Sequence, residues 1–227
     1  MPQHTKRRES GSVMRVIEKL AESKFSGVAI QKLEQLAALP QTPMWVQYSA
    51  IKKDALDALL FYRMGDFYEL FLDDAVEAAG ILGITLTARN KGEETPIPMC
   101  GVPFHSSTGY INRLLAAGKR VAICEQMEDP SATKGIVKRE IVRVVSPGMA
   151  FDADSLDSSR NNFLLVLLPA EEPGTGSYCV SDITTGSLEF ASYSSPEQLR
   201  DDLSLIQARE VAAPSTAIGT KIGRAHV

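Results

Sequence analysis

The chain has 227 residues, enough for one large domain or two small ones, each with its own hydrophobic core. Its 24 Lys and Arg residues against 28 Asp and Glu give a net charge of −4, which argues against a general binder of nucleic acid or anionic membranes. A run of about 18 apolar residues is absent, so no membrane-spanning helix is expected. Three scattered cysteines favour a reducing cytoplasm over a disulfide framework.

Charge is distributed unevenly along the chain. Residues 1–40 carry seven basic and four acidic side chains, residues 41–150 carry twelve and thirteen, and residues 151–221 carry four and eleven. The acidic excess therefore comes mainly from the last third of the chain, and the net charge describes none of the three regions. Residues 1–12 are polar and basic without periodicity, which is typical of disorder.

The first 40 residues are predicted to form an N-terminal extension that is disordered and then helical. Apolar side chains recur at helical spacing within residues 13–20 and again within 30–37, with Ser26-Gly27 between them. Pro40 ends the pattern. We expect this extension to pack loosely or not at all; the alternative is an amphipathic helix that binds a partner.

Residues 41–147 alternate between predicted helices and strands, which indicates a mixed α/β domain. Helices are expected to begin at Pro43, after a Thr42 cap, at Asp73-Asp74, which would cap the next helix, and at Ser106. The remaining predictions are strands at 59–64, 67–71, 84–87, 97–100, 120–124 and 136–145, turns at 65–66 and 101–103, and a polar loop at 89–95.

A second domain is predicted over residues 161–221, after a linker at 148–160. Its expected elements are strands at 163–168, 178–182 and 187–191, a helix from Ser195-Pro196, and a strand from Val211. The order β-β-β-α-β is the start of an α/β fold whose sheet is incomplete. The predicted fold class is therefore α/β (α+β mixed), with a mixed-sheet domain followed by an incomplete second domain.

The segment Phe67-Tyr68-Glu69 places two aromatic side chains and a carboxylate directly after the turn at Gly65. In a strand, Phe67 and Glu69 point to the same face. An exposed pair of this kind suits recognition of a flat group with a polar edge, such as a nucleic-acid base. From the pattern alone, however, we favour a buried Phe67 beside a solvated Glu69.

Other clusters of polar residues have simpler interpretations. The acidic residues near the same turn could bind a divalent metal, but helix capping and solvation are favoured; they are Asp66, Glu69, Asp73 and Asp74. The chain has neither zinc-ligand spacing nor a Walker A phosphate loop. Four basic residues could follow a phosphate backbone, although Glu140 interrupts them and a solvated strand edge is favoured; they are Lys134, Lys138, Arg139 and Arg143.

Four ordered segments carry a resemblance to a known family. They are LLFYRMGDFYELF at 59–71, PIPMCGVPFH at 96–105, VAICEQMEDP at 121–130 and VRVVSPG at 142–148. Together they resemble the bacterial DNA mismatch repair family MutS, and the resemblance runs from about residue 42 to residue 211. It implies a mismatch-recognition domain, MutS domain I, at 41–147, and a truncated connector domain, MutS domain II, with an RNase H-like fold, at 161–221.

The resemblance also implies a binding site for mismatched double-stranded DNA. Phe67 would insert as a wedge from the minor groove and stack on the mispaired base, and Glu69 would form a hydrogen bond to that base. Arg89 matches a family arginine near the kinked backbone, and Met99 matches a family residue close to the wedge. Our hypothesis is that burial and the field of the DNA raise the pKa of Glu69, so that the protonated carboxyl donates to a base nitrogen.

Full-length members of the family are implied to be homodimeric, DNA-dependent ATPases that use ATP and Mg²⁺ and bind a MutL-type partner through the connector domain. This chain would lack the ATPase and clamp domains, so we expect no enzymatic activity, no cofactor and no metal in it. The same resemblance implies a cytoplasmic, nucleoid-associated location without membrane contact. Residues 222–227 resemble a translated sequencing adapter and are expected to be a non-native tail at a truncated end.

Two other classes of function stay open. One is a partner-binding module that makes no contact with DNA. The other is a metal-dependent nuclease in the second domain, which would need carboxylates on adjacent strand ends, and Asp182 is the one residue suggestively placed for it.

Overall fold

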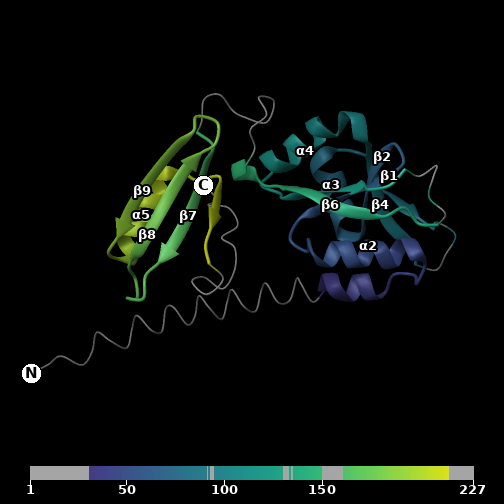
Figure 1. Cartoon of the computed structure of the whole chain (residues 1–227), viewed down its shortest axis with the longest axis horizontal. Coiled ribbons are helices and arrows are strands. Elements are labelled where there is room, and N and C mark those ends of the chain that lie inside the picture. Colours follow the sequence, from purple (N-terminus) through teal and green to yellow (C-terminus); the bar gives the residue numbers. More distant parts are fainter. Residues whose placement is uncertain are drawn as a thin grey trace, which may run out of the picture. The chain divides into compact units, whose positions relative to one another are not determined.

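The computed structural model describes residues 31–90, 92, 95–129, 133, 135–149 and 161–214 (Figure 1). The predictions for residues 1–30, for the linker from residue 150 to 160, for Lys134 and for the tail at 222–227 lie outside these residues. Two compact units are present: Lys32–Asn162, here called the first unit, and the second unit, which contains the described residues from Phe163 onward. No helix among the described residues is long and apolar enough to cross a membrane.

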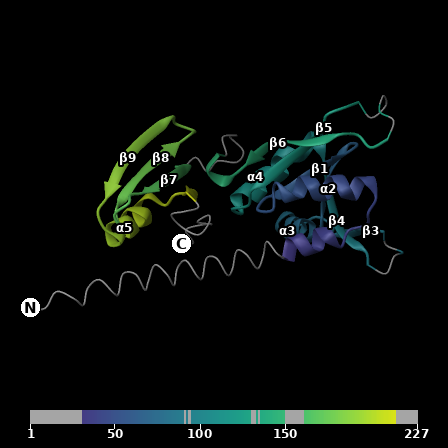
Figure 2. The ribbon, with the colours of Figure 1, turned by 60° about the horizontal axis from the view of Figure 1, so that its bottom comes forward.

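The first unit is built on a six-stranded sheet with the strand order β3-β4-β2-β1-β5-β6. β1 and β5 are parallel and the other neighbours are antiparallel, so the sheet is mixed, as the fold class predicts. Figure 2 shows β3 at one edge and β6 at the other. The strands are β1 (Leu59–Met64), β2 (Phe67–Phe71), β3 (Thr87–Arg89), β4 (Ile97–Pro103), β5 (Val121–Gln126) and β6 (Arg139–Val145).

Helices cover both faces of this sheet (Figure 1). α3 and α4 lie over a core that includes Phe61, Leu70 and Leu114, while α2 lies over a second core that includes Tyr48 and Phe71. The helical elements are α2 (Pro43–Lys53), α3 (Leu72–Leu82), α4 (Ser107–Ala116) and the short 3₁₀ turns η1 (Phe104–Ser106) and η2 (Pro147–Met149). Pro43 occupies the first turn of α2, as predicted, because its missing N–H has no intrahelical partner there.

Residues 31–37 form a helix that packs on the core of the first unit through Leu36, so the prediction of a loosely packed extension is wrong for this segment. Leu36 and Leu39 are buried in the core beneath α2. Lys32 Nζ donates to the carbonyl of Leu56 at 2.7 Å. The apolar periodicity identified the helix, but its burial depends on contacts with residues that lie far along the chain.

Three further predictions for the first unit are corrected. The predicted turn at Gly101–Pro103 is the continuation of β4, which pairs with β2 from Met99 to Pro103. The predicted strand at 84–87 is displaced to β3, so that Arg89 lies in a strand and not in the loop. α3 starts at Leu72 with Phe71 as its cap, so Asp73 and Asp74 lie within its first turn and do not cap it. The chain enters α3 without a loop because Leu72 adopts a φ of +57°.

Asp74 instead forms a buried ion pair with Lys52, which is a second reason why it is not a cap. Lys52 Nζ lies 2.6 Å from Asp74 Oδ2, and the two side chains are 5% and 3% exposed. Asp74 also accepts the backbone N–H of Leu60 at 3.0 Å, and Lys52 donates to the carbonyls of Ala55 and Ala58. Burial lowers the pKa of Lys52, and the charge of Asp74 opposes this effect. The pair therefore ties α2, α3 and β1 together.

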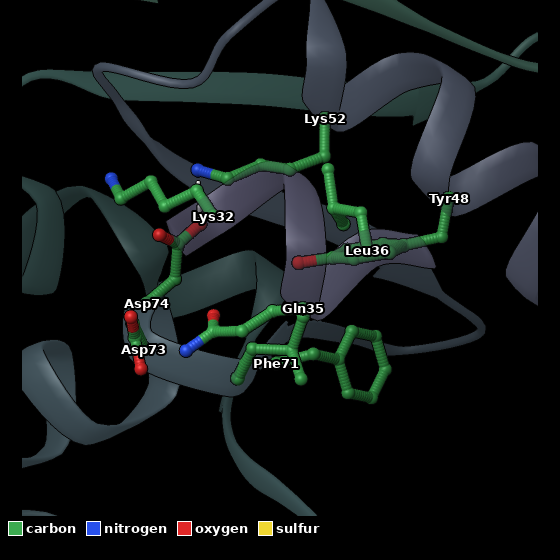
Figure 3. A pocket seen from close by; sticks show the side chains of 9 residues that line it. Lys32, Gln35, Leu36, Tyr48, Lys52, Phe71, Asp73 and Asp74 are labelled. Atoms are coloured by element: carbon green, nitrogen blue, oxygen red, sulfur yellow. Dashed lines mark ion pairs between the residues drawn. The ribbon is translucent and has the colours of Figure 1, made fainter. Parts of the chain in front are cut away.

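A small cavity lies beside this ion pair (Figure 3). Lys52 and Asp74 face one another in it, and the hydroxyl of Tyr48 points into the same space. That hydroxyl has no hydrogen-bond partner among the described residues, and burial raises the pKa of Tyr48 well above its usual range. The cavity has a volume of about 10 Å³, room for one water molecule at most, so it is no ligand site.

The second unit contains a four-stranded sheet of order β10-β7-β8-β9, with β10 parallel to β7 and the other pairs antiparallel. The elements follow the predicted β-β-β-α-β order. Helix α5 packs on a core that includes Leu165, Tyr178 and Val211. Ser195 caps α5 by accepting the N–H of Gln198 at 3.2 Å. The elements are β7 (Phe163–Pro169), β8 (Gly176–Asp182), β9 (Ser187–Tyr193), α5 (Pro196–Ile206) and β10 (Glu210–Ala212).

Breaking the buried ion pair should strongly destabilise the first unit. Lys52→Met leaves the Asp74 carboxylate buried without its cation, so we expect the free energy of unfolding to fall by about 3–5 kcal/mol. The loss is measured by urea denaturation followed through the fluorescence of Trp45, the single tryptophan of the chain and a buried residue of this unit.

Lys119→Met is the matched control, because it removes an exposed ion pair with Glu77. Its effect should stay within about 1 kcal/mol. Adding Asp74→Asn to Lys52→Met should recover part of the loss, since asparagine still accepts the N–H of Leu60. Equal losses in the two single lysine variants would contradict a structural role for the buried pair.

Candidate functional site

The predicted site residues of β2 lie where the sheet face that carries α2 is open to solvent. Antiparallel pairing with β4 sets Phe67 opposite Pro103, Glu69 opposite Gly101 and Phe71 opposite Met99, all on one face. Phe71 is buried beneath α2, whereas Phe67 and Gly101 are exposed. One face of a five-residue strand therefore changes from core to surface along its length.

Phe67 is 47% exposed, while its neighbour Tyr68 is buried on the opposite face. Glu69 is partly buried. The arrangement is the reverse of the burial favoured from the pattern alone, which placed the ring inside and the carboxylate in water. The strand period predicted correctly that Phe67 and Glu69 share a face, but the extent to which α2 covers that face is set by tertiary packing.

Glu69 and Arg89 form an ion pair across the sheet. Arg89 Nη1 lies 3.1 Å from Glu69 Oε2, with side-chain exposures of 34% and 22%. Burial raises the pKa of Glu69, and the positive charges of Arg89 and Arg139 act against the rise. Displacement of Arg89 by a ligand would therefore leave a half-buried carboxyl that takes up a proton more readily than an exposed one.

Arg89 is held in place by aromatic rings as well as by Glu69. Its guanidinium carbon lies 5.8 Å from the centre of the Trp45 ring and 5.9 Å from that of Phe71, within the range of cation–π attraction. The short strand β3 carries Arg89 beside β4. The structure thus joins Arg89 to Glu69, and Phe67 lies on the same face of β2 as Glu69.

Met99 is the fourth predicted residue, and it lies apart from Phe67. It is opposite Phe71 in the register and packs against the core beneath α2. Pro103, the register partner of Phe67, is four residues farther along β4, a rise of about 13 Å. Met99 therefore packs beneath the site, next to the core, and the described contacts do not place it beside Phe67.

Arg139 departs from the predicted solvated strand edge, because it is buried. Its guanidinium donates to the carbonyl of Arg63 at 2.7 Å and to Gln47 Oε1 at 3.1 Å, and it lies over the ring of Tyr62. Lys138, in contrast, is exposed and paired with Glu140. These contacts use Arg139 within the first unit, which weakens the alternative of a basic track for phosphates.

The acidic residues form no metal centre in the part of the chain that the structure describes, where no group of three or more His, Cys, Asp or Glu side chains could hold an ion. Asp74 is engaged with Lys52. Asp182, the carboxylate proposed for a nuclease, is 1% exposed and accepts the backbone N–H and the hydroxyl of Thr184 at 2.9 and 2.6 Å. It therefore stabilises the turn that follows β8.

Comparisons with known proteins identify the first unit. The family model described as MutS domain I matches residues 42–154. A DNA mismatch repair protein MutS from Staphylococcus epidermidis is 47% identical over 170 residues, which cover 75% of this chain and 19% of that protein. Proteins of the same name from Desulfosudis oleivorans and Desulforapulum autotrophicum are 46% and 48% identical, over 80% and 79% of this chain. The chain spans about a fifth of the length of these curated relatives.

The ion pair makes a testable prediction about the titration of Glu69. Arg89→Ala removes a cation that lowers the pKa of Glu69 and leaves the burial that raises it, so the pKa should rise further in the variant. The ¹³C shift of the Glu69 side-chain carboxyl, followed by NMR against pH, measures the change. Lys119→Ala removes a charge without contact to Glu69 and should leave the midpoint unchanged. A midpoint that stays the same or falls in Arg89→Ala would contradict the ion pair.

Proposed function

Because the chain belongs to the MutS family, whose domain I matches residues 42–154, we propose that its first unit recognises mispaired bases and small insertion or deletion loops in duplex DNA. Phe67 is the wedge and Glu69 is the hydrogen-bonding partner of the mispaired base. The observation that carries this proposal is an aromatic ring that is half exposed at the open end of the sheet, on the same face as a partly buried carboxyl.

The physics of a mismatch favours this mechanism. Mispaired bases stack and pair poorly, so kinking the duplex there costs less free energy than kinking matched DNA. An apolar ring that inserts between base steps tests this cost without reading a base code. Phe67 can serve because its ring already faces solvent, so its insertion into DNA breaks no core contact of the protein.

Glu69 has the second role in the proposed mechanism. A carboxylate near phosphates is repelled, whereas a protonated carboxyl donates a hydrogen bond to a base nitrogen. Burial already raises the pKa of Glu69, and the negative potential of DNA would raise it further. Arg89 would then leave Glu69 and turn toward the phosphate backbone, as the family resemblance implies.

Whole-protein properties are proposed for full-length proteins of this family. There we assign the homodimer, the ATPase activity with ATP and Mg²⁺, and the binding of a MutL-type repair partner through the connector domain. Within this chain the recognition step uses side chains alone, without a cofactor or a metal. Its affinity for DNA is expected to be weak, because one recognition unit lacks the avidity of a dimeric clamp.

Partner binding by the second unit is the second candidate function. It is favoured by apolar side chains on the sheet face opposite α5, of which Phe190 is 76% exposed and Leu188 and Leu168 are more than half exposed. Large exposed apolar areas are common at interaction sites. This candidate makes no use of Phe67, so one substitution separates it from mismatch recognition.

Phe67→Ala should remove the preference for mismatched DNA. Loss of a stacked ring is expected to lower the affinity for a G·T duplex by about 1–3 kcal/mol, roughly 5- to 150-fold, with little effect on a matched duplex. Fluorescence anisotropy with labelled duplexes at low salt measures both affinities. Phe190→Ala, which removes an exposed phenylalanine from the second unit, is the control and should change neither. An unaltered preference in Phe67→Ala would favour the partner-binding module.

Glu69 variants test the state of the carboxyl in the complex. Glu69→Gln keeps a hydrogen-bond donor, so it should retain most of the mismatch affinity, whereas Glu69→Ala should lose it. Because the wild-type complex needs the protonated form, its affinity should fall as pH rises through the pKa of the bound Glu69, and Glu69→Gln should abolish this dependence. A Gln variant as weak as the Ala variant, with unchanged circular dichroism, would count against a protonated donor.

A further inference from the structure

Gly101 occupies an unusual place for a glycine, because it lies inside β4, directly opposite Glu69 and exposed to solvent. Glycine weakens a strand relative to alanine, since it lacks a side chain to pack and has more freedom to lose on folding. A glycine inside a strand is therefore expected where the backbone conformation, the space or a ligand requires it.

The backbone conformation does not require glycine here. Gly65 and Gly83 have φ values of +59° and +63°, in the left-handed region that disfavours other residues. Gly101 lies outside that region, within a regular ladder with β2. Any L-residue could adopt its backbone angles.

The available space does not require glycine either. A Cβ added at Gly101 would lie 3.4 Å from the carbonyl oxygen of Tyr68, 3.8 Å from Glu69 Cγ and 3.8 Å from Phe67 Cδ1. These are ordinary van der Waals distances, and apart from the two chain neighbours of Gly101 no described heavy atom is nearer. The fold would thus accept alanine at this position, at a gain in strand propensity.

We propose that Gly101 is the position at which the mispaired nucleotide approaches the sheet most closely. This inference rests on the proposed function of Phe67 and Glu69. A Cβ at Gly101 would contact the wedge ring and the carboxyl-bearing side chain at the same distance, so it would fill the space between them. A base that stacks on Phe67 while it is hydrogen-bonded to Glu69 has to span that space, and the bare backbone of Gly101 leaves room for its edge.

The size of the side chain at this position therefore determines how far the base can approach. A methyl group in Gly101→Ala would hold the base edge away from one of its two partners, and the branched side chain of Gly101→Val would separate it from both. Valine is chosen because β-branched residues favour strands, so that the larger side chain does not itself weaken β4.

The test compares Gly101→Ala and Gly101→Val in the full 227-residue chain, using anisotropy with G·T and matched duplexes. We expect the mismatch preference to fall in Gly101→Ala and to fall by at least about fivefold in Gly101→Val, the loss of one stacked base. The melting temperature, followed through Trp45 fluorescence, should be unchanged or raised. Gly109→Ala and Gly109→Val are the controls, because Gly109 is an exposed glycine of α4 with open space around it.

The possible outcomes separate this inference from the function on which it rests. If the wild-type chain shows no mismatch preference, or if Phe67→Ala retains it, the proposed function fails. If the wild-type chain has the preference and Phe67→Ala loses it, but Gly101→Val keeps it, the close approach at Gly101 is overturned. A fall in melting temperature that parallels the loss of binding would also overturn it, since Gly101 would then be needed by the fold.

Discussion

The register between β2 and β4 is the constraint on which both the core and the candidate site depend. The pairs Phe67–Pro103, Glu69–Gly101 and Phe71–Met99 place the proposed wedge, the carboxyl of Glu69 and a core aromatic ring on one face. Because side chains alternate with a period of two, a slip of one residue would bury Glu69 on the α3 side and expose Leu70. The buried Phe71 and Leu70, on opposite faces, make such a slip costly and so hold Phe67 at the surface.

The aromatic core beneath α2 stabilises this pairing of β2 with β4. Trp45, Tyr48, Tyr62 and Phe71 form edge-to-face contacts, with ring centres 4.8 to 6.5 Å apart. The Lys52–Asp74 pair lies beside them and joins α2 to α3. Arg89 extends from the same rings to Glu69. The exposed end of the sheet thus continues directly from a tightly packed core, which suits the proposed insertion of Phe67 between stacked bases.

The net charge of the chain has to be interpreted together with the contacts that its basic side chains make in the structure. Lys52 and Arg139 are buried and occupied by contacts within the first unit, so they add little to an attractive field for phosphates. A weak attraction for phosphates is compatible with the proposed function, because an inserted aromatic ring tests the stiffness of DNA and depends little on a basic surface. The chain spans about a fifth of the length of its curated relatives.

The sequence by itself determined the order of elements in both units, the mixed α/β class, and the shared face of Phe67 and Glu69, because local periodicity and turn residues carry that information. It also carried the motifs that resemble MutS. Tertiary structure alone decided that Phe67 is exposed, that Asp74 pairs with Lys52 instead of capping α3, and that Gly101 lies in a strand. A strand pattern fixes which side chains share a face, but how far a helix covers that face depends on residues 31–53, whose contacts with β2 and β4 no local pattern contains.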